Sequence, residues 1–216
     1  MRSVFLLSQF LKAHFKSLLN LSALILGLIN GLFLMKFYLR DRPKLKVKPV
    51  DSGFYQWWFR MPDNQHDGNT TRRYGFLAYV DVLNKGLRKT ELDSWWLHLQ
   101  TKGKGKHRLK PLNMPEPKVS IGGLEKFYPV LGQRGLHFGG STLTEPGCSI
   151  TGMVFFEYEC FGDELWNPST LNSKISTTFY VKSIFGQCCQ CIIEFSEKSL
   201  DEIDVMAPGI HLTSKK

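Results

Sequence analysis

The residues best suited to chemistry in this chain are five cysteines, three of which are crowded together near the C-terminus. Cys188, Cys189 and Cys191 could form a thiol or metal centre, and Cys148 and Cys160 lie upstream. A Cys-Cys-x-Cys run lacks the paired C-x2-C spacing of a zinc site, and no histidine lies nearby in the sequence. We therefore expect small buried thiols, with Cys189 and Cys191 on one side of a strand and Cys188 on the other.

The familiar catalytic motifs are missing from this sequence. It contains no G-x-S-x-G nucleophile, no H-E-x-x-H zinc pair and no G-x-x-x-x-G-K-[ST] phosphate loop. The Gly-rich residues 132–140 could bind an anion through backbone N–H groups, but a long connection between strands needs the same glycines. We expect no catalytic residue, no metal ion and no cofactor, and keep a thiol- or metal-dependent enzyme as an alternative.

Two adjacent tryptophan pairs stand out among the aromatic residues, at positions 57–58 and 95–96. Neighbouring side chains of a strand point to opposite faces, so one tryptophan of each pair should lie in the core and the other should be exposed. Exposed tryptophan is enriched where proteins bind one another. We predict that Trp58, Trp95 and Trp96 contact a protein partner. Placement of the first pair at a membrane interface, or in a loop that buries it, is left open.

The elements that must position these residues begin with an uncharged segment, Ser17 to Met35. Nineteen residues form about 28 Å of helix, close to the roughly 30 Å hydrocarbon core of a bilayer. A cleaved signal peptide would end in small residues, whereas here Lys36, Phe37 and Tyr38 follow. We therefore predict a transmembrane helix over residues 17–38. Its Asn and Gly stripe could contact a partner helix, or could simply be tolerated in a single span.

Positive charge is concentrated beside this helix. Residues 1–48 carry nine Lys or Arg against one acidic residue, whereas residues 49–216 carry nineteen against eighteen. A nucleic-acid-binding protein would carry the excess on its folded domain, so we expect no nucleic acid partner. We expect anionic lipid headgroups to bind the basic side chains after the helix. These are Lys36, Arg40, Arg42, Lys44 and Lys46.

The same charges predict an orientation. Six basic residues follow the span and three precede it, which favours the C-terminal side as the cytoplasmic one. We expect a single-pass membrane protein with a cytoplasmic soluble domain, the alternative being a periplasmic or extracellular one. The expected segments are a basic lead-in (1–16), the helix, a juxtamembrane linker (39–50), a β domain (51–196) and a polar tail (197–216).

Beyond the helix the hydrophobic period changes to two, the pattern of half-buried strands. Residues 73–83, 150–158 and 174–184 alternate most clearly, and Phe185-Gly186-Gln187 is typical of a hairpin turn. Seven or eight such strands predict an all-β fold, an immunoglobulin-like antiparallel β-sandwich preceded by one N-terminal transmembrane helix; an open barrel is second.

This architecture, without catalytic motifs, indicates a non-catalytic protein-binding or assembly module of a membrane complex. The partner would bind through the aromatic sheet face or through the transmembrane helix. A domain that binds lipid or a small ligand between the sheets is the alternative. The basic run from Lys102 to Lys110 could bind phosphate, although we interpret it as a solvated hairpin loop.

Overall fold

A computed structural model describes residues 2–50, 55–66, 68–101, 105–132, 142–161 and 174–212. For residues 2–19, 66, 121 and 161 within these ranges it describes the backbone alone. The chain divides into two compact units, residues 1–42 and 43–216.

The first unit is one helix, α1 (Arg2–Arg40). Leucine, alanine and methionine favour a helix here, and Pro43 restricts the residue before it, which helps to end the helical run. Its segment Asn20–Arg40 is long and apolar enough to cross a membrane. This segment overlaps the predicted span of residues 17–38.

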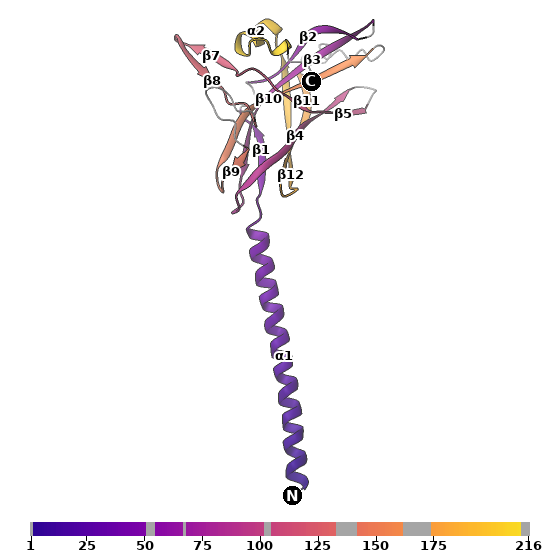
Figure 1. Cartoon of the computed structure of the whole chain (residues 1–216), viewed down its shortest axis with the longest axis vertical. Coiled ribbons are helices and arrows are strands. Elements are labelled where there is room, and N and C mark those ends of the chain that lie inside the picture. The colour runs from indigo at the N-terminus through magenta and orange to yellow at the C-terminus, as the bar shows by residue number, and fades with distance from the viewer. Residues whose placement is uncertain are drawn as a thin grey trace. The chain divides into compact units, whose positions relative to one another are not determined.

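The second unit consists mostly of strands (Figure 1). In chain order the elements are β1 (Leu45–Pro49), β2 (Gln56–His66), β3 (Asn69–Asn84), β4 (Thr90–Thr101), β5 (Gly105–Leu109), β6 (Pro111–Leu112), β7 (Lys118–Ile121), β8 (Leu124–Phe127), β9 (Leu143–Thr144), β10 (Ser149–Phe161), β11 (Lys174–Ser183), β12 (Cys188–Glu197), the helix α2 (Leu200–Met206) and the 3-10 helix η2 (Ile210–Leu212). The expected all-β class with an N-terminal apolar helix is confirmed.

Most of these strands form one large mixed sheet, in the order β5-β4-β11-β12-β2-β3-β10-β6, with β1 also paired to β3 and β9 to β4. The pairs are antiparallel except β12 with β2, which is parallel and places Ser196 opposite Trp57. The expectation of a purely antiparallel arrangement is therefore wrong at this pair. A parallel pair joins strands that are distant in the chain, so no hairpin signal could have predicted it.

The main core lies between two groups of strands. β1, β3 and β10 supply one side, where Phe76, Val80 and Phe156 are fully buried. β4, β11 and β12 supply the other, and the Phe156 and Phe179 ring centroids lie 6.1 Å apart across the core. The alternation predicted for β3, β10 and β11 is confirmed.

A second core covers the opposite face of β2, β3 and β10. Phe59 stacks on Phe155 at 6.1 Å there, over Gly75, where a Cβ would lie 2.5 Å from the Phe59 ring. The helix α2 adds Ile203 and Met206, both buried. The segment expected as a polar tail from residue 197 therefore contains a packed helix.

The domain also begins earlier than predicted. In β1, Leu45 and Val47 are buried, alternating with the exposed Lys46 and Lys48, and the strand pairs with β3. Residues 45–49 belong to the sheet, so the linker expected over 39–50 is shorter.

Candidate functional site

The candidate site is the outer face of β5, β4, β11 and β12. The inner face of these strands packs in the main core through residues such as Leu97 and Phe179. The outer face carries Trp96 opposite Tyr180 and His98 opposite Thr178, because the two strands pair antiparallel in this register. Side chains alternate between the faces, so the outer row contributes nothing to the core.

An aromatic ladder runs across this face. The rings of Trp96 and Tyr180 stack almost in parallel, with an interplanar angle of 3° and centroids 5.3 Å apart. The His98 ring lies 4.6 Å from the Tyr180 ring. On the edge strand β5, Arg108 places its guanidinium carbon 4.1 Å from the centroid of the Trp96 ring. We call Trp96, His98, Arg108 and Tyr180 the aromatic ladder.

The ladder is held from both sides by strand pairing. Arg108 lies opposite His98 in the β4–β5 register, and Lys106 lies opposite Gln100 on the same outer face. Burial lowers the pKa of His98 below its ordinary value, and the positive charges of Arg108 and Lys106 lower it further. At neutral pH His98 is therefore uncharged, and the positive charge at this edge comes from Arg108 and Lys106.

The face continues over β12 with Gln190 and Ile192, and with the exposed Glu194 opposite Ser176. Tyr180 lies opposite Gln190 and Thr178 opposite Ile192, whose side chain is 67% exposed. Ile192 is a large apolar residue in the middle of a strand with nothing packed over it among the described residues. The outer surface thus runs from a basic edge, through stacked rings, to an exposed aliphatic side chain.

The three tryptophans predicted to contact a partner lie in different places. Trp58 is 1% exposed in the main core, so its predicted role at a surface is wrong. Trp95 points inward from β4 and packs against the core. It also covers Gly132, where a Cβ would lie 2.2 Å from the indole ring. Only Trp96 lies on the outer face as expected.

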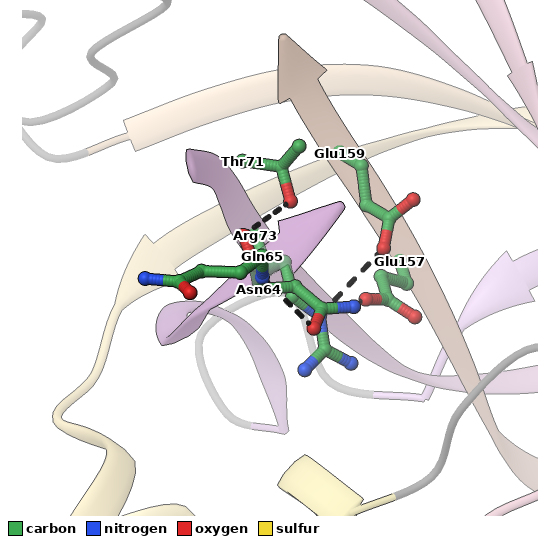
Figure 2. A network of polar contacts seen from close by, with 6 residues as sticks. All are labelled: Asn64, Gln65, Thr71, Arg73, Glu157 and Glu159. Carbon is green, nitrogen blue, oxygen red and sulfur yellow. Dashed lines mark hydrogen bonds and ion pairs between the residues drawn. The ribbon is translucent and has the colours of Figure 1, made fainter. Parts of the chain in front are cut away.

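A buried polar cluster lies on β3 and β10, next to the second core (Figure 2). The Arg73 guanidinium bonds to Glu157, both side chains being nearly inaccessible, and lies 3.8 Å from Glu159. The adjacent strand is fixed by the hydroxyl of Thr71, which donates to the carbonyl of Asn64 at 3.1 Å. The Glu157 carboxylate compensates a guanidinium charge that would otherwise be costly to bury, so the pair supports the fold.

The cysteines behave as the strand alternation predicts. Cys189 and Cys191 pack against the main core and Cys188 is exposed. Burial raises the pKa of Cys189 to about 11 and that of Cys191 to about 12. The nearby thiols add to both shifts. Among the described residues no three His, Cys, Asp or Glu side chains are grouped as metal ligands.

The predicted headgroup ligands divide between the two units. Lys36 and Arg40 lie on α1 and Arg42 follows it, whereas Lys44 precedes β1 and Lys46 is exposed on that strand. The Gly-rich candidate loop lies outside the described residues from position 133 onward, as do residues 102–104 of the basic run.

Comparison with known proteins adds little. No protein-family model and no curated protein matches the chain. Among solved structures, a Bordetella pertussis protein provisionally assigned as ApaA is 13% identical, with a TM-score of 0.29, over 72% of this chain and 93% of that one. An X-ray structure of a structural genomics target is 10% identical, with a TM-score of 0.28, over 73% and 89%. These values are too low to assign a fold or a function.

Proposed function

We propose that this chain is a single-pass, membrane-anchored, non-catalytic protein-binding module that serves the assembly of a membrane complex. The observation that carries the proposal is the aromatic ladder. Trp96 and Tyr180 stack on the outside of a sheet whose inside already forms a complete core. Aromatic and arginine side chains grouped on a surface are the residues most enriched at the energetic centres of protein interfaces.

The partner surface is acidic. Arg108 and Lys106 lie at the edge of the ladder. Lys182, on the same outer face of β11, already pairs with Asp93 at 3.7 Å. Charge complementarity of this kind increases the association rate and selects among partners. Among the described residues β5 is also the last strand of the sheet order, so an extended acidic segment could pair with its outer edge.

The domain architecture that we infer is an immunoglobulin-like sandwich. The support is the main core, which is enclosed by β1, β3 and β10 on one side and by β4, β11 and β12 on the other. In such sandwiches the outer sheet faces and edge strands are available for partners.

The anchor that we infer is α1, with Lys36, Arg40, Arg42, Lys44 and Lys46 at anionic headgroups and the domain in the cytosol. The support is the apolar segment Asn20–Arg40 and the excess of basic residues after it. A dual reporter fused after Lys216, active on one side of the membrane only, tests the orientation. A cytosolic signal is expected, and an external signal would refute the orientation.

The binding function is tested by photo-crosslinking in cells from position 190, which lies beside Tyr180. We expect a crosslinked protein whose yield falls at least about tenfold with Trp96→Ala or Arg108→Glu, since central interface residues carry most of the binding energy. Ser176→Ala is the matched control, because Ser176 is exposed on the same face of β11, away from the ladder. A crosslinking yield that is unchanged in both Trp96→Ala and Arg108→Glu would refute the proposed face.

α1 offers a second surface for a protein partner. A Cβ placed at Gly27 or Gly31 would meet nothing within 4 Å, so both positions are open along one side of the helix. Small residues four apart permit close helix packing in lipid. If Gly31→Leu, rather than Trp96→Ala, abolished the crosslink, the partner would bind through the helix.

Two features of the domain argue against the alternative functions, a thiol- or metal-dependent enzyme and a domain that binds lipid or a small ligand. The high pKa values of Cys189 and Cys191 keep both thiols protonated at neutral pH, whereas a nucleophile or metal ligand must be a thiolate. Close approaches at Gly75 in the second core and at Gly152 beside Leu131 of the main core, where an added Cβ would lie 2.5 Å from neighbouring atoms, leave little room for a ligand at either place.

A further inference from the structure

Three loops of the β domain meet at the end where the chain enters it. They are residues 85–89 between β3 and β4, residues 145–148 before β10, and residues 184–187 between β11 and β12. Figure 1 shows β9 and the β11–β12 turn at this same end of the domain, where β1 begins. We call these three segments the entry loops.

A buried asparagine joins the entry loops to the first residues of the domain. The Asn84 side chain accepts from the backbone N–H groups of Lys44 at 3.3 Å and Gly86 at 3.0 Å, and donates to the carbonyl of Arg88 at 2.8 Å. Its backbone bonds to Cys148 and Gly147. The loops are therefore fixed with respect to residue 44, which follows the end of α1 by four positions.

Two of the entry loops, residues 85–89 and 184–187, expose large apolar side chains at their tips. Leu87 is 58% exposed, Ile184 is 55% exposed and Phe185 is 49% exposed. Loop tips are ordinarily built from small and polar residues, and scattered apolar residues on a surface need no explanation. Here the Arg88 guanidinium carbon lies 4.7 Å from the centroid of the Phe185 ring, so the two loops contact each other and their apolar tips form one patch.

The patch is surrounded by basic side chains. Lys44, Lys85 and Arg88 are exposed, and among the described residues none of the three has an acidic side chain within ion-pair distance. A fourth, Lys89, pairs with Glu145 at 2.8 Å, and Glu91 accepts from Thr142. The acidic groups of this end are thus already engaged, and the surface left over is apolar with a positive rim.

Apolar tips within a basic rim are complementary to an anionic lipid surface. Lys and Arg attract the headgroups while leucine, isoleucine and phenylalanine insert between them, the arrangement found on interfacial membrane-binding segments. The segment between α1 and the β domain is short enough for the entry loops to reach the headgroups. Residues 41–44 span at most about 14 Å when extended, and a headgroup layer is about 5–8 Å thick.

We propose that the entry loops rest on an anionic bilayer, with Leu87, Ile184 and Phe185 inserted among the headgroups and Lys44, Lys85 and Arg88 bound to phosphate. This inference rests on the proposed anchoring of α1. The loops add a second contact with the bilayer, which orients the domain. The contact directs the outer sheet face sideways, because β4 and β12 begin at the entry loops and β11 ends there, so all three strands extend lengthwise from this end.

The test uses the full-length chain in nanodiscs of about three parts phosphatidylcholine to one part phosphatidylserine. A photo-crosslinking amino acid is placed at position 185, and lipid adducts are counted by mass spectrometry. The control position is 205 on α2. Val205 is 79% exposed, and α2 follows the far end of β12, ten residues of strand and about 30 Å from the entry loops.

We expect at least about tenfold more lipid adducts from position 185 than from position 205, because only the former lies among headgroups. Lys85→Glu with Arg88→Glu should lower the yield at 185 several-fold in the anionic nanodiscs and leave it unchanged in pure phosphatidylcholine. Equal yields at 185 and 205 would overturn the proposal. A crosslink from 185 to a second protein chain instead of lipid would overturn it as well.

A third position separates this proposal from the anchoring on which it rests. A crosslinker at Leu28, within α1, reports whether the helix lies in lipid. Adducts from position 28 without adducts from position 185 would refute the entry-loop contact alone. Absence of adducts from both would refute the anchor and the contact together.

Discussion

Trp58 and Trp96 provide the sharpest contrast between the inside and the outside of this domain. Each is one member of an adjacent tryptophan pair, so the sequence alone does not show which of the two is buried. Trp58 is 1% exposed in the main core, 6.3 Å from the Tyr74 ring. Trp96 stands on the outer face between Arg108 and Tyr180. Replacing each by alanine should therefore have different effects on folding.

The magnitudes follow from these contacts. Trp58→Ala leaves a cavity in a closed core and should lower the free energy of unfolding by about 3–5 kcal/mol. Trp96→Ala removes one stacked pair, worth about 0.5–1.5 kcal/mol, and one exposed cation–π contact, worth about 0.5–1 kcal/mol. The expected loss at Trp96 is thus about 1–2.5 kcal/mol, with no buried cavity.

Thermal unfolding of the full-length chain in detergent, followed by circular dichroism of the β structure, measures the difference. One kcal/mol corresponds to about 2–4 °C in Tm for a domain of this size. We expect Trp58→Ala to lower Tm about twice as far as Trp96→Ala. The double variant Trp96→Ala/Tyr180→Ala should cost less than the sum of the single changes, because both remove the same stack.

Equal losses of Tm for Trp58→Ala and Trp96→Ala would refute the assignment of the inner and outer faces. Additive effects of Trp96→Ala and Tyr180→Ala would refute the stacked pair. Either result would also remove the basis of the proposed partner face, since that proposal requires an outer surface that is dispensable for folding.

The other expectations concern single groups. Cys191, with a pKa of about 12, should resist alkylation near neutral pH while the exposed Cys148 reacts; faster reaction at Cys191 would contradict its burial. Arg108→Ala should raise the pKa of His98, followed by NMR titration. In the unchanged protein the lowered pKa of His98 contributes stability that is fully present above the unfolded-state pKa and is lost as the pH falls through the folded-state pKa. A melting temperature independent of pH would contradict this contribution. Glu157→Ala leaves a buried arginine poorly compensated and should cost about 3–5 kcal/mol, and a change in Tm of only a degree or two would refute the role of that cluster.

Local periodicity made much of the β domain predictable. The alternation along β11 correctly separates core from surface, because a side-chain period of two is a property of the strand itself. Along β3 and β10 it separates two faces that are both buried, one in each core. The turn of β11 into β12 was predictable for a similar reason, since Gly186 has a positive φ of 78° that glycine adopts without strain.

The candidate site was less predictable, because it depends on pairing between distant strands. Trp96 and Tyr180 are more than eighty positions apart, and only the register of β4 with β11 brings their rings together. Arg108 joins them through β5, which the sequence shows only as part of a basic run. Trp58 was assigned to the surface because alternation says that one tryptophan of a pair is inside, but not which one.

The anchoring of the chain is tested most directly by the intact mass of the protein that remains in cell membranes after an alkaline carbonate wash. We predict that the protein in the washed membranes still contains α1, because the apolar segment Asn20–Arg40 would hold it in the bilayer. A shorter chain lacking α1, released into the wash, would show that the apolar segment is a cleaved signal sequence. It would contradict the membrane-anchored function.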